Sequence, residues 1–173
     1  AGTDFSALPD VETGDSFTIG TVFTPKIGDG VRDFYVTLDY YDIKIEDFIG
    51  TFGAQEILDS CYVLGDATQC AKVRRLNGDL ITPGSGLALF TTNLAYREAE
   101  GIELGNGAGV GLGAAGGLKF MANVNKYLTQ EFRSSAAVPT TDCLGHYGPV
   151  WGGPRPEIRW IHRTTWGYNQ IHE

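Results

Sequence analysis

Several stretches of the chain alternate between hydrophobic and polar residues, which is the period of a β-strand. From Phe34 onward one face carries Phe34, Val36, Leu38 and Tyr40, and the other carries Tyr35, Thr37, Asp39 and Tyr41. After Tyr40 the phase changes, because Asp42, Lys44 and Glu46 take the side that was apolar. The change is typical of a transmembrane strand that leaves the lipid at a pair of interfacial tyrosines. A β-bulge in a soluble sheet would give the same pattern.

Further segments alternate in the same way. An early strand ends at Pro25 and presents Phe17, Ile19, Thr21 and Phe23 on one face. A later strand within Leu118 to Phe132 separates Leu118, Phe120, Ala122, Val124 and Leu128 from Lys119, Asn123, Asn125 and Thr129. A strand is expected within Leu87 to Leu112, and the last strand, Ile158 to Tyr168, places Trp160, Trp166 and Tyr168 on one face with His162 between them. The pattern predicts an all-β fold, an antiparallel meander of about six strands.

The connections between these strands are of two kinds. Gly113 to Gly117 predicts a tight turn, whereas Ile49 to Gly86 and Arg133 to Pro156 are long loops. The first long loop is expected to contain a short helix over Ala54 to Ser60 and turns at Asn77-Gly78 and Pro83-Gly84. Short turns at one edge and long loops at the other are typical of an outer-membrane barrel.

Glycine recurs at every second position from Gly105 to Gly113, and this leaves one face of the strand bare. Because glycine allows a second backbone to approach closely, we expect another packed element against this face. The same region contains Gly111-Leu112-Gly113-Ala114-Ala115-Gly116, which matches the dinucleotide-binding fingerprint. That fingerprint requires a following helix, but the residues after Leu118 alternate as a strand. No cofactor is therefore predicted.

Composition and charge narrow the classes of function. Hydrophobic residues make up 42% of the 173 residues and charged residues 20%, without an apolar run of the length of a spanning helix. Any contact with a membrane would therefore be made by strands or by the surface. The net charge of -8 and the absence of clustered Lys and Arg exclude nucleic acid as a partner.

Candidate catalytic and metal-binding residues are few. Asp142, Cys143 and His146 resemble a metal site or a thiol with its base, but a solvated loop explains them better. Glu98, Glu100 and Glu103 are a possible acid and base pair, although hydrated charges at a strand end are the commoner case. No catalytic residue, no metal ligand and no enzymatic activity is predicted.

Four segments together resemble one protein family. They are SFTIGTVFTP, LDYYDIKIEDFIGTFGAQEILDSCY, GGLKFMANVNKYLTQEF and PRPEIRWIHRTTWGY, and they cover most of Asp15 to Tyr168. In this order and spacing they resemble the C-terminal part of the β-barrel of TonB-dependent outer-membrane receptors. The resemblance implies that residues 1–173 are a single-domain fragment of a transmembrane β-barrel, with the plug and the final strands outside it. His162 departs from the family pattern, which has an apolar residue there.

The resemblance also implies a function, a location and partners. Such receptors lie in the bacterial outer membrane, bind a scarce nutrient such as a siderophore or a carbohydrate, and import it without covalent chemistry. The implied partners are the remaining barrel strands and plug, the TonB energy-coupling complex acting through the plug, the small-molecule nutrient and outer-membrane lipid. The long loops would face the ligand with Tyr62, Tyr147 and Trp151, unless these aromatic side chains pack on their own loops.

The cysteines fit an oxidising compartment. Cys61 and Cys70 close a short loop, and the periplasm would favour a disulfide between them, the alternative being two buried thiols. Cys143 is then either unpaired or bonded to a segment outside these residues. Two other functions remain open at this point, a soluble secreted β-sheet binding module and a small hydrolase that uses the Asp142 to His146 loop.

Overall fold

A computed structural model describes residues 9–135, 138–148 and 151–168. The chain is mostly β, with two helices in the region after β3. The elements are β1 Thr13–Phe23, β2 Val31–Glu46, β3 Ile49–Thr51, α1 Ala54–Tyr62, α2 Ala67–Cys70, β4 Val73–Arg74, β5 Gly86–Leu87, β6 Thr91–Asn93, β7 Tyr96–Gly111, the 3-10 helix η2 Gly113–Ala115, β8 Gly117–Arg133, β9 Thr141–Asp142, β10 Tyr147–Gly148, β11 Gly153–Pro154 and β12 Ile158–Gly167.

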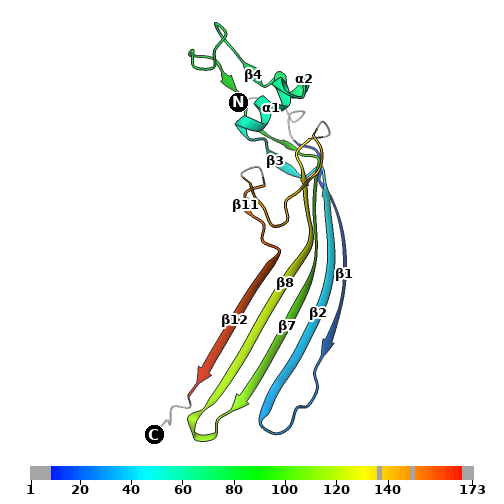
Figure 1. Cartoon of the computed structure of the whole chain (residues 1–173), viewed down its shortest axis with the longest axis vertical. Coiled ribbons are helices and arrows are strands. Elements are labelled where there is room, and N and C mark those ends of the chain that lie inside the picture. The colour runs from blue at the N-terminus through cyan, green and yellow to red at the C-terminus, as the bar shows by residue number, and fades with distance from the viewer. Residues whose placement is uncertain (1–8, 136–137, 149–150, 169–173) are drawn as a thin grey trace. The chain divides into compact units, whose positions relative to one another are not determined.

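The long strands and the short strand β9 form one six-stranded sheet. Its order is β1-β2-β7-β8-β12, and β9 pairs with β8 (Figure 1). β12 runs antiparallel to β8 with Ile158 opposite Lys126 and Trp166 opposite Leu118, and β9 is antiparallel to β8 as well. The predicted all-β class and antiparallel strand arrangement are confirmed. β1 and β12 are the two ends of this order, and all of their residues are exposed.

The contacts of the chain divide it into two compact units. The first, here called the loop unit, comprises Ala1–Asp15, Ile43–Glu98 and Gln130–Arg155. The second, the sheet unit, comprises Ser16–Asp42, Ala99–Thr129 and Pro156–Glu173. β2 crosses from one unit to the other between Asp42 and Ile43, at the point where the sequence pattern changes phase.

The turns of the sheet unit are short. Between β7 and β8 the chain reverses through η2, where Gly113 and Gly116 have φ values of 59° and 89° that favour glycine. The indole N–H of Trp166 donates a hydrogen bond of 2.9 Å to the carbonyl of Ala115 and so ties β12 to this turn. The predicted tight turn is confirmed. The residues that follow form the strand β8, so the dinucleotide fingerprint lacks the helix that it requires.

The loop unit contains the helices and the short strand pairs. β3 pairs with β6, β4 with β5 and β10 with β11, all antiparallel. The helix α1 extends two residues beyond the predicted Ser60, and α2 was not predicted. Asn77 and Gly78 have φ values of 54° and 82°, as the predicted turn requires.

Among the described residues, every buried hydrophobic side chain belongs to the loop unit. These side chains are Phe52, Ile57, Cys61, Leu94, Phe132 and Cys143. Phe48, Val73, Leu87 and Trp151 pack against this core from its margin. The described residues of the sheet unit therefore contribute strands but no buried hydrophobic side chain. Within the described part of the chain, no helix has the length and apolar character needed to cross a membrane.

Candidate functional site

One face of the sheet unit is apolar and exposed. The register between β8 and β12 places Phe120 opposite Thr164, Ala122 opposite His162 and Val124 opposite Trp160. Alternation along each strand adds residues to this face. The exposed members include Phe17, Ile19, Phe23, Leu38, Ile102, Leu104, Leu128, Ile158, Trp160, Trp166 and Tyr168. We call this surface the apolar face. Trp160, on the apolar face, is 73% exposed, so neighbouring residues cover little of its aromatic side chain.

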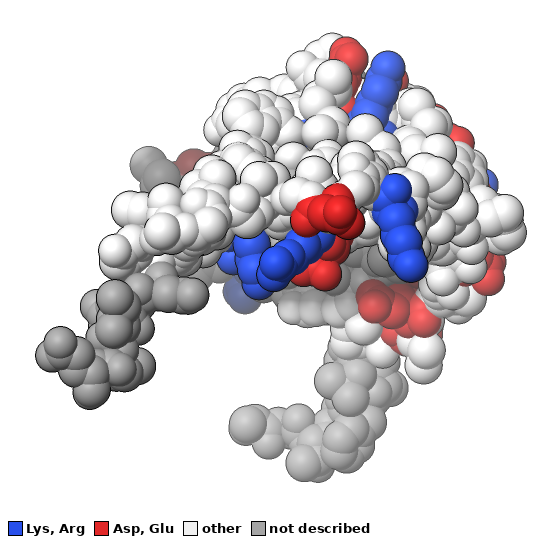
Figure 2. All heavy atoms as spheres, turned by 90° about the horizontal axis from the view of Figure 1, so that it is seen from below, with Lys and Arg blue, Asp and Glu red and all other residues white. Residues whose placement is uncertain are grey.

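The opposite face of the same sheet is polar and hydrogen-bonded. Asn125 accepts a hydrogen bond of 3.0 Å from Tyr41, and the Asn123 amide donates one of 3.4 Å to Glu103. These asparagines, with Arg159, line an open groove of about 640 Å³. Figure 2 shows blue and red side chains together in a hollow on one side of the sheet. The two faces therefore differ in chemistry as the alternation predicts.

Glycines of β7 lie under side chains of β2 on this polar face. A methyl group added at Gly101 would overlap the Tyr41 ring, and one at Gly107 would overlap Tyr35. At Gly105 the added methyl group would meet Thr37. The neighbouring strand thus fills the space at these glycines, where the sequence suggested a separate packed element.

Carboxylates near the start of β7 are held by hydroxyl groups and a lysine. In the sheet unit, Glu100 accepts hydrogen bonds from Tyr40 at 2.8 Å and from Thr129 at 2.9 Å. In the loop unit, Glu98 accepts a hydrogen bond from Tyr96 and lies 3.3 Å from the Lys44 ammonium group. Each carboxylate is engaged by neighbouring strands, an arrangement that stabilises strand ends.

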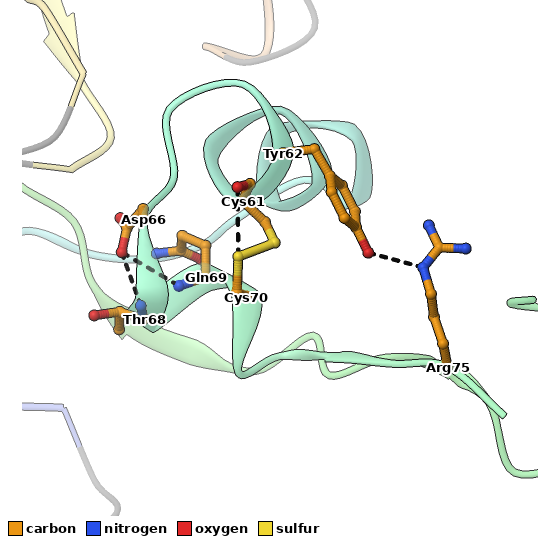
Figure 3. The surroundings of a disulfide bond; sticks show 7 residues. All are labelled: Cys61, Tyr62, Asp66, Thr68, Gln69, Cys70 and Arg75. Carbon is orange, nitrogen blue, oxygen red and sulfur yellow. Dashed lines mark hydrogen bonds between the residues drawn. A yellow bond between two sulfur atoms is a disulfide. The ribbon is translucent and has the colours of Figure 1, made fainter. Parts of the chain in front are cut away.

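A disulfide joins the two helices of the loop unit, as predicted. Cys61 of α1 is bonded to Cys70 of α2 (Figure 3). The Asp66 side chain caps α2 by accepting hydrogen bonds from the backbone N–H groups of Thr68 and Gln69. These links fix the connection between the helices.

Tyr62, a predicted ligand contact, lies next to this disulfide. Its side chain is 58% exposed, and its hydroxyl accepts a hydrogen bond of 2.8 Å from Arg75 Nε (Figure 3). The guanidinium group of Arg75 also lies 5.2 Å from the centre of the Tyr62 ring. Tyr62 and Arg75 therefore form an exposed aromatic and cationic pair.

The other two predicted ligand contacts differ from each other. Tyr147 is 76% exposed and lies opposite Pro154 in the β10–β11 pair. Trp151 packs over Gly148 and against the core, and its carbonyl accepts a hydrogen bond of 2.7 Å from Arg155. Its indole nitrogen is buried and has no hydrogen-bond partner among the described residues.

The candidate catalytic loop is held by local hydrogen bonds. Asp142 accepts from the backbone N–H of Leu144, and the His146 ring lies 2.7 Å from the carbonyl oxygen of Leu144. Cys143 is a free thiol buried in the core, and burial raises its pKa. A protonated buried thiol is a poor nucleophile. No group of three potential metal ligands occurs in the described ranges.

Further cationic groups of the loop unit, among them Lys72 and Arg97, lie against aromatic rings. Lys72 Nζ is 4.4 Å from the ring centre of Phe52 and 5.0 Å from that of Phe90, and burial lowers its pKa. The guanidinium group of Arg97 is 5.1 Å from the ring centre of Phe48. Sequence reasoning missed these contacts, as well as that of Arg75, because the rings and cations are brought together only by the folded loops. Comparison of the chain with protein-family models, with curated proteins and with solved structures finds no match.

Proposed function

We propose that the chain is part of a TonB-dependent receptor of the bacterial outer membrane, which binds and imports a scarce nutrient such as a siderophore or a carbohydrate. The observation that supports this function best is the exposed apolar face of the sheet unit. Its aromatic and aliphatic side chains lie on strands whose opposite face is hydrogen-bonded and polar. A strand with lipid on one side and an aqueous lumen on the other has this pattern.

The length of the apolar face suits a bilayer. From Leu118 to Leu128 the strand β8 rises about 33 Å at about 3.3 Å per residue. With the tilt of about 40° that is usual for transmembrane strands, this length covers about 25 Å, the height of the apolar band of an outer-membrane barrel. Lys126 interrupts the face near one end, where its stem can reach water.

The open ends of the sheet suit a larger assembly. β1 and β12 are exposed along their whole lengths, and unpaired strand edges of this kind pair readily with further strands. In the proposed receptor these edges pair with the remaining barrel strands, which would make the fragment a part of a transmembrane β-barrel. The family that the sequence resembles also has a plug. The TonB complex, acting through this plug, would provide the energy for import.

The experiment places single tryptophans in bilayers whose acyl chains carry bromine atoms, which quench indole fluorescence on contact. Variants that keep only Trp160 or only Trp166 are expected to be quenched, whereas the variant that keeps only Trp151, a residue of the loop unit, is not. A chain that folds cooperatively as a monomer without detergent, and does not associate with the vesicles, would instead be a soluble β-sheet binding module.

A further inference from the structure

Two arginines of the loop unit each contact a residue at the margin of the same core, Arg97 contacting Phe48 and Arg155 contacting Trp151. Arg97 stands on β7 with its guanidinium group against the Phe48 ring. Arg155 follows β11 and donates a hydrogen bond from Nη2 to the Trp151 carbonyl oxygen. Within residues 9–135, 138–148 and 151–168, neither guanidinium group forms an ion pair. Partly buried cations of this kind are normally paired.

The charge of the Arg155 guanidinium group acts on Arg97. Burial lowers the pKa of Arg97, and the positive charge of Arg155 lowers it further. Both arginines also favour the thiolate of Cys143, so all three residues share one neighbourhood. The acidic residues that act on the same thiol are Asp142 and Glu131, and their charges disfavour the thiolate.

The indole N–H of Trp151 is a third donor in the same part of the loop unit. The indole nitrogen of Trp151 is buried and has no partner in the described part of the chain. Its own carbonyl is bonded to Arg155, so the ring and that guanidinium group belong to one local structure. Trp151 also packs at the margin of the core that contains Cys143, as does Phe48 beneath Arg97. A buried donor without an acceptor is destabilising, and an added acceptor would remove that cost.

We propose that Arg97, Arg155 and the indole N–H of Trp151 form a binding site for an oxyanion, the carboxylate or phosphate group of an anionic ligand. Guanidinium groups match both anions because their N–H donors are planar and paired. An oxyanion here would neutralise the two cations and supply an acceptor for the indole N–H. The inference rests on the proposed function, since it states that the ligand bound by the long loops is an anion.

The test follows the Trp151 indole N–H by NMR in the ¹⁵N-labelled 173-residue chain, folded in maltoside micelles that contain no phosphate. The resonance is assigned with Trp151→Phe. Inorganic phosphate is then titrated at constant ionic strength, with chloride as the reference anion. We expect a saturable shift of this resonance with phosphate but not with chloride, because the indole N–H gains an acceptor.

Matched variants identify the cations that hold the anion. Arg97→Gln is expected to weaken phosphate binding about tenfold or more, since a charge-assisted hydrogen bond contributes about 1.5–3 kcal/mol. Arg97→Lys keeps the charge but not the paired donors. Its affinity for phosphate is expected to lie between those of Arg97→Gln and the unaltered chain. Arg74→Gln, which alters an exposed residue of β4, is the control and is expected to bind as the unaltered chain does.

A second titration adds phosphatidylglycerol to the micelles in the absence of free phosphate. A shift with this lipid alone would identify a lipid headgroup as the source of the oxyanion and would support the site. Absence of a saturable shift with both probes would overturn it, as would equal binding by Arg97→Gln. Such a failure leaves the quenching of Trp160 and Trp166 in bilayers unaffected, so it is distinguishable from failure of the proposed function.

Discussion

The hydroxyl of Tyr41 donates a hydrogen bond of 3.0 Å to Oδ1 of Asn125, although β7 lies between their strands β2 and β8. The contact is possible because Gly101 of β7 has no side chain, and the Tyr41 ring occupies the space where a methyl group would be. One glycine thus allows a tyrosine to reach across a neighbouring strand. On the polar face, the alternate glycines of β7 and the aromatic residues of β2 form a single packing unit.

Replacement of Gly101 by Ala is expected to break this bridge. The added methyl group would overlap Tyr41 and would lie 2.9 Å from the backbone carbonyl oxygen of Lys126. Overpacking of this kind costs about 1–3 kcal/mol, so the free energy of unfolding should fall by that amount. The measurement is urea unfolding of the chain in lipid vesicles. Gly111→Ala is the control, because among the described residues nothing beyond Gly111 and its two chain neighbours lies within 4 Å of the added methyl group.

A double-mutant cycle separates the hydrogen bond from the steric effect. Tyr41→Phe alone should lower the free energy of unfolding by about 0.5–1.5 kcal/mol. In the Gly101→Ala background it should cost much less, since the bridge is already broken. Additive effects of the two substitutions would contradict the dependence of the bridge on Gly101.

Loss of the disulfide is expected to destabilise the loop unit. Cys61 and Cys70 enclose a short loop, and the chain-entropy relation gives about 2.7 kcal/mol for closing a loop of about ten residues. The double variant Cys61→Ser/Cys70→Ser should therefore show earlier amide exchange in α1 and α2, measured by hydrogen exchange with mass spectrometry. Treatment of the unaltered chain with a reductant should give the same result, and the reductant should have no further effect on the double variant.

The sheet unit was largely predictable from the sequence. A strand has a local period of two, so Leu118, Ala122 and Asn123 could be assigned to their faces without knowledge of the partner strands. The helix over Ala54 to Ser60 and the Cys61–Cys70 disulfide also depend on neighbouring residues in the chain, and both are present. Whether the sheet continues into a barrel depends on strands that pair with β1 and β12, and remains a prediction.

The contacts between distant segments were not predictable. The bond from Tyr41 to Asn125 depends on the register of strands far apart in the chain, which alternation along one strand does not fix. The place of Trp151 in a long loop left two interpretations open, a ligand contact or packing on its own loop, and its packing at the margin of the core is seen only in the folded chain. Arg97 and Arg155 gave no sequence signal, since single arginines far apart in the chain form no motif.

Alkylation of Cys143 is expected to be slow and to require a high pH. Burial raises the pKa of this thiol above its ordinary value, so the thiolate forms later in a titration than in an unfolded chain. The measurement is the rate of reaction with iodoacetamide as a function of pH, with the unfolded chain as reference. If the pH midpoint of the reaction rate equals that of the unfolded chain, the thiol is not held protonated by burial.

The same pKa shift predicts a dependence of stability on pH. The pKa of the Cys143 thiol is raised in the folded state. Its contribution to the free energy of unfolding is therefore fully present below the pKa of the unfolded chain, and it is lost as the pH rises through the pKa of the folded state. The difference in free energy of unfolding between the unaltered chain and Cys143→Ala should therefore shrink above about pH 8.5, the ordinary value for cysteine. Both proteins contain the same tyrosines and lysines, so the contributions of these residues cancel in the difference between the two free energies of unfolding. A difference that stays constant up to the folded value would show that the thiol does not titrate with folding.

Arginine placed on neighbouring positions of β8 distinguishes the two faces of the sheet. Ala122 lies on the apolar face opposite His162, and Asn123 lies on the polar face, where it donates to Glu103. In lipid vesicles, Ala122→Arg should lower the free energy of unfolding by about 2–4 kcal/mol, because a cation would be held near the middle of the bilayer. Asn123→Arg should cost less, since its charge faces water and a carboxylate. Equal costs for the two variants would mean that neither face contacts lipid, and the proposed position of the sheet in the membrane would be wrong.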